Sequence, residues 1–216
     1  MLGRFHGYDM VKVKVCGITD LRDASTAVAL GADALGFIFA PSPRRVSPEE
    51  ARDIIRNIPP FVKTVGVFVN EDPRVIRDII ERSGIDLIQL HGDETPEQCK
   101  EWMPFAIKAV KMRDASALRS VESYTGSVRA LLLDTYSMET AGGTGKTFDW
   151  RLAMEAKGAG IPLILAGGLG PSNIEDAVSF VRPYAVDVNS GIEESPGHKS
   201  HTLMKELFQR LEHIRG

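Results

Sequence analysis

Residues Val11–Cys16 read VKVKVC and form the first of eight short runs rich in β-branched and aliphatic residues. Such runs are typical of strands that are buried on both faces of a parallel sheet, provided that amphipathic segments separate them. The spacing between runs averages about 25 residues, enough for one strand and one helix. Eight units of this kind predict an α/β protein with a closed (β/α)8 TIM barrel and a single domain. The runs begin near Val11, Ala34, Val62, Leu87, Ala106, Ala130, Leu163 and Ala185.

Helix-start signals lie between the runs. Ser47-Pro48-Glu49-Glu50 supplies an N-cap serine, a proline at the first helical position and a glutamate at the third. Asp72-Pro73 and Thr95-Pro96-Glu97-Gln98 open the next two helices in a similar way. The last helix is predicted from about Ser200 to Ile214, and its regularly spaced leucines indicate packing against the barrel.

An open, doubly wound sheet is the alternative architecture. It normally has fewer strands and carries a G-x-G-x-x-G fingerprint in its first strand-to-helix turn. That turn here reads Cys16-Gly17-Ile18-Thr19-Asp20, which does not match the fingerprint. The barrel is therefore favoured, and dinucleotide binding is not expected.

The length and charge of the chain restrict its domains and partners. With 216 residues there is room for one barrel, which we assign to residues 11–216, after an N-terminal extension over residues 1–10. The net charge is -3, and lysines and arginines do not cluster among aromatics, so nucleic-acid binding is not expected. The chain shows neither a signal-peptide pattern nor an apolar run of the ~20 residues that a membrane span needs. A cytoplasmic protein without membrane contact is expected.

Cysteine usage argues against a disulfide framework and against a metal site. The two cysteines, Cys16 and Cys99, are far apart in the sequence and lie outside any Cys/His metal-ligand pattern. Cys99 falls within a predicted helix, away from any strand end, and is interpreted as a packing or surface residue.

The segment Gly142–Thr147, GGTGKT, ends like a phosphate-binding P-loop. The full G-x-x-x-x-G-K-[ST] pattern requires a glycine at position 140, where this chain has Thr140, and the segment starts well beyond its strand. ATP or GTP binding is therefore not expected. The whole stretch from Thr135 to Phe148 is interpreted as a lid, in which Lys146 could meet an anion.

Two of the predicted strands end in residues able to move protons. Cys16 ends the first run, and Asp134 ends the sixth, Leu131–Asp134. The C-terminal ends of barrel strands converge on one face, so a thiol and a carboxylate there can reach opposite sides of a small substrate. The alternatives are a cysteine that only packs and an aspartate that caps a turn.

The last two strands run into loops that suit an anion. The candidate residues are Gly167 and Gly168 after the seventh strand, and Asn189, Ser190 and Gly191 after the eighth. Barrels often bind phosphate between these loops, because glycine lets backbone N–H groups approach the anion and a short helix adds its positive N-terminus. A tight turn without a ligand is the alternative for the glycine pair.

Eight segments, in register and in the expected order, resemble the phosphoribosylanthranilate isomerase family. The resemblance extends from about Val11 to the C-terminus. It implies a (β/α)8 barrel enzyme of tryptophan biosynthesis that uses no metal and no organic cofactor. It also implies conversion of N-(5-phosphoribosyl)anthranilate into 1-(2-carboxyphenylamino)-1-deoxyribulose 5-phosphate, an Amadori rearrangement. The segments are Lys14–Thr19, Gly31–Phe39, Ser42–Ser47, Gln89–Gly92, Leu132–Asp134, Gly142–Trp150, Ala166–Leu169 and Asp187–Glu193.

The rearrangement needs one proton delivered to the furanose ring oxygen and another removed from C2 of the sugar. The resemblance implies Asp134 as the general acid and Cys16 as the general base. A carboxyl in a partly dry pocket can stay protonated, and nearby positive charge or peptide dipoles favour a thiolate.

The resemblance also implies the substrate-binding residues. Arg44 corresponds to the arginine that holds the anthranilate carboxylate, although its neighbour Arg45 stands where many members carry an aromatic residue. His91 could shape the anthranilate pocket or be a hydrogen-bonded histidine at the barrel rim. Asp187 is expected to face the sugar without a role in proton transfer.

Other functions on this architecture are less consistent with the chain. An isomerase acting on a phosphoribosyl imidazole carboxamide would be expected to carry two aspartates at these strand ends, which Cys16 disfavours. Indole-glycerol-phosphate synthase would be expected to use a lysine and glutamate set that we cannot place. The presence of both Cys16 and Asp134 disfavours a non-catalytic phosphosugar-binding barrel. A monomer and a homodimer stay open, as does acceptance of a second phosphoribosyl substrate.

Overall fold

The computed structural model describes residues 10–134 and 150–215. Residues 1–9 of the predicted extension lie outside the described residues. The predicted lid from Thr135 to Phe148 also lies outside them, together with Lys146 and the P-loop-like segment Gly142–Thr147. The division into an extension over residues 1–10 and a barrel over residues 11–216 stays a prediction.

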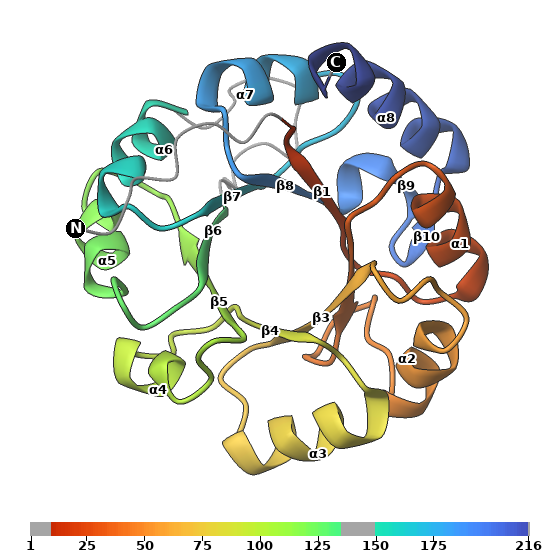
Figure 1. Ribbon diagram of the computed structural model, residues 1–216, viewed down its shortest axis with the longest axis horizontal. Helices are drawn as coiled ribbons and strands as arrows, with labels where there is room; N and C mark the ends of the chain where they lie inside the picture. The colour runs from red at the N-terminus through yellow and green to blue at the C-terminus, as the bar shows by residue number, and fades with distance from the viewer. Residues whose placement is uncertain (1–9, 135–149, 216) are drawn as a thin grey trace.

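Eight parallel strands close into a barrel in the order β1 to β8, with β1 paired to both β2 and β8 (Figure 1). The predicted (β/α)8 TIM barrel is confirmed, and each strand begins at or within one residue of its predicted start. The strands are β1 (Lys12–Val15), β2 (Ala34–Ile38), β3 (Lys63–Phe68), β4 (Leu87–Leu90), β5 (Ala106–Lys111), β6 (Ala130–Asp134), β7 (Leu163–Ala166) and β8 (Ala185–Val188).

Helices surround the barrel as an outer ring (Figure 1). The predicted capping boxes are present at Ser47 with Glu50 and at Thr95 with Gln98, and Asp72 caps the helix between them. These caps satisfy backbone N–H groups that the first helical turn leaves without partners, and so they fix where each helix starts. The helices are α1 (Leu21–Ala29), α2 (Pro48–Ile55), α3 (Pro73–Ser83), α4 (Pro96–Lys100), α5 (Ala117–Ser123), α6 (Trp150–Ala156), α7 (Ile174–Val181) and α8 (His201–Arg215).

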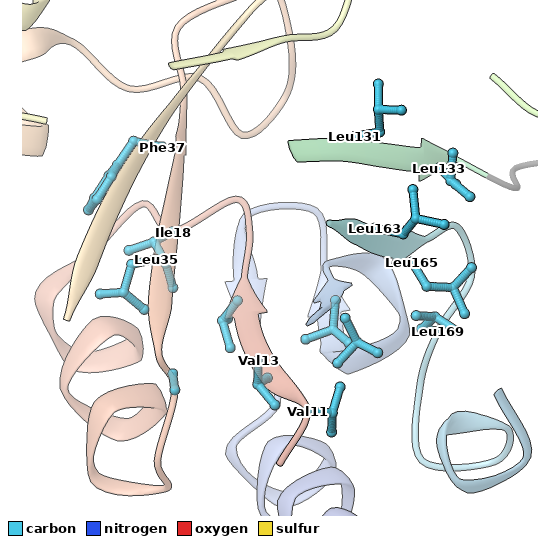
Figure 2. Packing of buried hydrophobic residues seen from close by; sticks show 14 of the residues in the cluster. Val11, Val13, Ile18, Leu35, Phe37, Leu131, Leu133, Leu163, Leu165 and Leu169 are labelled. Atoms are coloured by element: carbon cyan, nitrogen blue, oxygen red, sulfur yellow. The ribbon is translucent and has the colours of Figure 1, made fainter. Parts of the chain in front are cut away.

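The apolar residues form two layers because successive side chains of a strand point to opposite faces. In β6, Leu131 and Leu133 belong to the layer between barrel and helices, whereas Leu132 belongs to the cluster inside the barrel. Figure 2 shows residues of the outer layer, among them Val13 and Leu165. Each fully buried aliphatic side chain stabilises the fold by roughly 1.5–3 kcal/mol, so the two layers hold the barrel rigid beneath its upper rim.

The same alternation sorts the polar residues of the strands. Val13 and Val15 face the outer layer, so Lys14 and Cys16 face the barrel interior. Val186 and Val188 likewise face outward, which turns Asp187 inward. Leu132 lies inside the barrel, so Asp134, two residues later, also faces inward. Polar and ionisable side chains from distant parts of the chain therefore lie close together at one end of the barrel.

A two-stranded antiparallel hairpin follows β8 and was not predicted from the sequence. It consists of β9 (Glu193–Ser195) and β10 (His198–Lys199), and it lies beside α1 (Figure 1). The backbone N–H of Lys199 donates to Asp23 of α1, which fastens the hairpin against that helix. Its strands are too short to show a two-residue hydrophobic period, so pattern reasoning had no signal for it.

Candidate active site

A cavity of about 180 Å³ opens at the C-terminal ends of the strands. Among the residues that the structure describes, nine of the ten predicted site residues line it, and Arg44 is the exception. The cavity thus joins the predicted proton-transfer residues to the predicted anion loops. The nine are Cys16, His91, Asp134, Gly167, Gly168, Asp187, Asn189, Ser190 and Gly191.

Cys16 directly follows β1, and its backbone N–H donates to the Val188 carbonyl of β8. Gly36 in β2 leaves the space that the thiol occupies, because a Cβ at Gly36 would lie 2.7 Å from Sγ of Cys16. Burial raises the pKa of the Cys16 thiol above its usual value. The Lys14 ammonium acts to lower that pKa, and the Asp187 carboxylate acts to raise it. The site therefore holds a buried thiol with a cation beside it, and these two surroundings act on the pKa in opposite directions.

Lys14 is a buried lysine with two side-chain acceptors. Its Nζ lies 2.9 Å from Oδ2 of Asp187 and 2.9 Å from Oε1 of Gln89. Burial acts to lower the pKa of Lys14, but the charges and hydrogen bonds of Asp187 and Cys16 outweigh it, and the pKa is raised. Lys14 is thus an ammonium ion. Within the described part of the chain, the buried Oδ1 of Asp187 has no hydrogen-bond partner, although Asp187 lines the cavity.

Asp134 ends β6 and meets His91, which follows β4. Nε2 of His91 lies 3.2 Å from Oδ2 of Asp134, and Nδ1 of His91 lies 2.9 Å from Nε2 of Gln89. His91 also lines the cavity. His91 is thus a hydrogen-bonded histidine at the barrel rim, and its part in an anthranilate pocket stays a prediction.

Arg44 lies near Asn189 of the cavity wall, because a Cβ at Gly17 would lie 2.8 Å from Cδ of Arg44 and 2.7 Å from Oδ1 of Asn189. Glu193 of β9 binds the guanidinium of Arg44. Nε of Arg44 donates to Oε1 of Glu193 at 2.8 Å, and Nη2 donates to Oε2 at 2.6 Å. Burial acts to raise the pKa of Glu193, but hydrogen bonds from Arg44 and Lys199 outweigh it and lower the pKa to about 2. This pair uses one edge of the guanidinium and leaves Nη1 for another acceptor. Arg45 is exposed.

Lys199 orients Asn189, one of the predicted phosphate ligands. Nζ of Lys199 donates to Oδ1 of Asn189 at 2.8 Å and to Oε1 of Glu193 at 2.8 Å. Because an ammonium can only donate, it holds the amide oxygen of Asn189, and the amide nitrogen is left as a donor. The hairpin thus fixes both Arg44 and Asn189 through Glu193 and Lys199.

The loops after β7 and β8 form the opposite side of the cavity. Gly167 and Gly168 have φ values of 93° and 64°, in the region that side chains disfavour. A Cβ at Gly168 would meet nothing within 4 Å. Residues Ser190–Ile192 form a 3-10 helix, and Gly191 packs on the carbonyl of Leu169. The arrangement exposes backbone at the cavity, as an anion site requires.

Four residues of this site were missed by sequence reasoning, namely Lys14, Gln89, Glu193 and Lys199. A signal existed for two of them, since Lys14 and Gln89 each precede a predicted site residue by two positions in a strand and so share its face. For Gln89 a second signal was its place as the one polar residue in an apolar strand, Leu87–Leu90. Glu193 and Lys199 depend on the hairpin and had no comparable signal.

Among the described residues, His, Cys, Asp and Glu side chains do not gather in any group of three or more that could hold a metal ion. Over the same residues, no helix has the length and apolar character required to cross a membrane.

Comparison with known proteins gives consistent results. Residues 13–210 match the family model described as N-(5'phosphoribosyl)anthranilate (PRA) isomerase. The N-(5'-phosphoribosyl)anthranilate isomerase of Geobacter sulfurreducens is 52% identical over 202 residues, which cover 93% of this chain and 98% of that protein. The crystal structure of phosphoribosyl anthranilate isomerase from Thermotoga maritima is 43% identical with a TM-score of 0.88, covering 94% of this chain and all of that one. A crystal structure of the isomerase in complex with reduced 1-(o-carboxyphenylamino)-1-deoxyribulose 5-phosphate is 40% identical, with a TM-score of 0.85 and the same coverage.

Proposed function

The chain belongs to the N-(5'-phosphoribosyl)anthranilate isomerase family, and we propose that the cavity at the upper rim of its barrel is where it carries out that reaction. The protein is an isomerase of tryptophan biosynthesis. It converts N-(5-phosphoribosyl)anthranilate into 1-(2-carboxyphenylamino)-1-deoxyribulose 5-phosphate by an Amadori rearrangement. The reaction only moves protons and opens a ring, so side chains with suitable acidity can accomplish it.

The observation that carries the residue assignment is the shared cavity. Cys16 at the end of β1 and Asp134 at the end of β6 both line it, and strands β7 and β8 separate them around the barrel. A base and an acid are therefore available on different sides of one bound molecule, as the rearrangement requires.

Asp134 acts first, as the general acid. Its carboxyl donates a proton to the furanose ring oxygen, the bond from that oxygen to C1 breaks, and the ring opens to an iminium ion. The N–H of His91 can stabilise the carboxylate that Asp134 then becomes, because a hydrogen bond to the charged form favours it.

Cys16 acts second, as the general base. Its thiolate takes the proton from C2, and the electron pair of that C–H bond neutralises the iminium to give an enolamine. The enolamine becomes the ketone when a proton is added at C1 and the hydroxyl proton at C2 is lost. Lys14 keeps a positive charge beside Cys16 and so favours the thiolate against the effect of burial.

The rest of the cavity fits the ends of the substrate. The glycine loops after β7 and β8 suit the phosphate, and the side chains of Ile38 and Val67 form an apolar wall across the barrel that suits the anthranilate ring. Arg44 is placed to bind the anthranilate carboxylate through the guanidinium edge that Glu193 does not hold.

Asp187 completes the sugar site. Its Oδ1 offers a buried acceptor at the cavity, and a sugar hydroxyl is the natural donor for it. The carboxylate is held by Lys14 and has no part in proton transfer in this proposal. Action in the cytoplasm, as a monomer or homodimer, stays a prediction.

The test is an assay with N-(5-phosphoribosyl)anthranilate, generated in situ because it hydrolyses, followed by the loss of its fluorescence. Cys16→Ala and Asp134→Asn should each lower kcat by about 10²–10⁴-fold, the usual range for loss of an acid or base. Cys99→Ala is the matched control for the thiol, since Cys99 is buried in α4 away from the cavity, and it should stay within a few fold of wild type. Similar losses in the two cysteine variants would contradict the base assignment, and a near-normal kcat in Asp134→Asn would contradict the acid.

A further inference from the structure

One amide side chain connects the two sides of the proton-transfer site. Gln89 is buried in β4 and makes two hydrogen bonds, one with each end of its amide. Its Oε1 accepts from Nζ of Lys14 at 2.9 Å, and its Nε2 lies 2.9 Å from Nδ1 of His91. His91 in turn reaches Oδ2 of Asp134 with Nε2, at 3.2 Å. Lys14 is the cation beside Cys16, so the chain of contacts runs from the base to the acid.

The chemistry of Lys14 fixes the direction of every bond in this chain. An ammonium group has donors only, so the amide atom that faces Lys14 must be the oxygen. The amide nitrogen therefore faces His91, and an amide nitrogen can only donate. Nδ1 of His91 must then accept, which places the proton of the neutral ring on Nε2. That N–H points at Oδ2 of Asp134 and donates to it.

We propose that Gln89 is a positioning residue of the isomerisation, which holds His91 as the Nε2–H tautomer and through it orients the carboxyl of Asp134. This inference rests on the proposed role of Asp134 as the acid. When Oδ2 accepts a hydrogen bond, the transferable proton of the carboxyl is carried by Oδ1. After Oδ1 has given that proton to the ring oxygen, the N–H of His91 remains in place on the carboxylate. Gln89, which also lines the cavity, thus contributes to kcat through His91.

The opposite tautomer would work against the acid. If the ring proton sat on Nδ1, it would face the N–H of Gln89, and two donors would meet. Nε2 would then be an acceptor beside Asp134 and would attract the carboxyl proton to itself. The proton needed at the substrate would be held on the wrong side of Asp134. The orientation of the Gln89 amide therefore affects proton transfer by Asp134 as well as the packing of the site.

The first test reads the tautomer in the wild-type enzyme. With 15N-labelled histidine, two-bond 1H–15N correlation spectra distinguish a protonated from an unprotonated ring nitrogen, and a His91→Asn variant assigns the signal. Wild type should show a protonated Nε2 and an unprotonated Nδ1 at His91. A proton on Nδ1 would overturn the proposal. This measurement needs no substrate, so its failure is distinct from a failure of the proposed function, which would appear as lack of turnover in wild type.

The second test removes the amide. Gln89→Met keeps the length of the side chain but loses both hydrogen bonds, so His91 should populate both tautomers and kcat should fall about 10- to 100-fold with little change in KM. Gln209→Met makes the same chemical change at an exposed position of α8, and it should stay within about 2-fold of wild type.

A third variant keeps the shape of the side chain. Gln89→Glu accepts at both ends, so it should draw the ring proton of His91 to Nδ1 and lower kcat at least as far as Gln89→Met does. A normal kcat in either Gln89 variant would overturn the proposal. A lowered kcat in a variant whose His91 still carries its proton on Nε2 alone would also overturn the proposal. Gln89 would then affect the reaction in some way other than by fixing the tautomer of His91.

Discussion

Two buried ion pairs in this barrel have nearly the same dimensions and opposite surroundings. Lys14 and Asp187 are 2.9 Å apart with side-chain exposures of 4% and 8%, and Lys108 and Glu94 are 2.9 Å apart with exposures of 3% and 8%. The first pair faces the barrel interior at the cavity. The second lies outside the barrel wall, where Lys108 approaches the ring of Tyr124, the residue that follows α5.

In the outer pair, both the ammonium group and the carboxylate have hydrogen-bond partners. Lys108 donates to the carbonyls of Leu90 and Gly92 and to Oε2 of Glu94, so its three donors have three acceptors. Glu94 also accepts from the backbone N–H groups of Asn70 and Gly92. This pair ties the loop after β4 to the strands beside it, and its role is structural.

The inner pair is incomplete within the described residues, because Oδ1 of Asp187 lacks a hydrogen-bond partner there. A buried carboxylate oxygen without a donor is unfavourable by a few kcal/mol, and a substrate hydroxyl would remove that cost. Burial and distance alone therefore do not separate a structural ion pair from a functional one. The unsatisfied hydrogen-bonding capacity that faces the cavity does.

The largest effect should come from breaking the outer pair. Lys108→Met leaves the Glu94 carboxylate buried without its cation, so the free energy of unfolding should fall by about 3–5 kcal/mol. Urea denaturation followed by circular dichroism measures this. Lys205→Met on the exposed side of α8 is the matched control and should change stability by less than about 0.5 kcal/mol. A loss below about 1 kcal/mol for Lys108→Met would mean that the outer pair is not structural.

The next largest effect sharpens the assignment of the inner pair. In Asp187→Asn, Lys14 holds the amide oxygen, so a nitrogen donor replaces the acceptor that faces the cavity. We expect kcat/KM to fall by about 10- to 150-fold, corresponding to about 1.5–3 kcal/mol for a lost hydrogen bond to a charged group. Glu94→Gln makes the same change in the outer pair and should keep kcat/KM of the folded protein within about 3-fold. Equal losses in both variants would remove the distinction between the pairs.

The two lysines should also differ in their effect on the thiol. Because burial raises the pKa of Cys16, its rate of alkylation by iodoacetamide should still be increasing above pH ~8.5, where an ordinary thiol is half ionised. Lys14→Met removes the cation that opposes this shift, so the midpoint should move up further. Lys108→Met should not move it. The measurement is made in a Cys99→Ala background, and a midpoint below that of a free thiol would contradict the raised pKa.

The smallest effect concerns the arginine that is only partly held by its partner. Arg44→Lys keeps the charge but loses the planar fork, and should lower kcat/KM by roughly 5-fold, about 1 kcal/mol. Arg45→Lys, at an exposed position, should change it by less than about 2-fold. A substrate analogue without the anthranilate carboxylate provides the check. Wild type should lose much of its kcat/KM on this analogue, whereas Arg44→Ala, which already lacks the contact, should lose far less. Equal losses of kcat/KM in the two enzymes would show that Arg44 does not contact the carboxylate.

The sequence was sufficient for the fold because the signals were local. Runs such as Leu131–Asp134 have the length and apolar content of a barrel strand, and the spacing between the eight runs leaves room for one helix each. Helix starts such as Ser47–Glu50 depend on residues a few positions apart, and the structure confirms them. Cys16 and Asp134 could be placed at strand ends for the same reason, and the barrel topology then brings them to one face.

The remaining features of the site depend on contacts between residues that are distant in the sequence. Lys14 and Asp187 are 173 positions apart, and they meet only because β1 closes the barrel against β8. Arg44 and Glu193 are 149 positions apart, and they meet because a hairpin that carries no periodic pattern folds beside α1.

Local sequence patterns were thus enough to predict the barrel, the face that carries the chemistry, and the candidate thiol, carboxylate and glycine loops. The positions of Lys14 beside Cys16 and of Gln89 between Lys14 and His91 became evident in the folded structure. Propensity and periodicity act over a few residues along the chain, whereas a hydrogen bond or ion pair depends on distances in space of about 3 Å. Closure of the barrel sets those distances. In the sequence, closure is indicated only by the number of predicted strands.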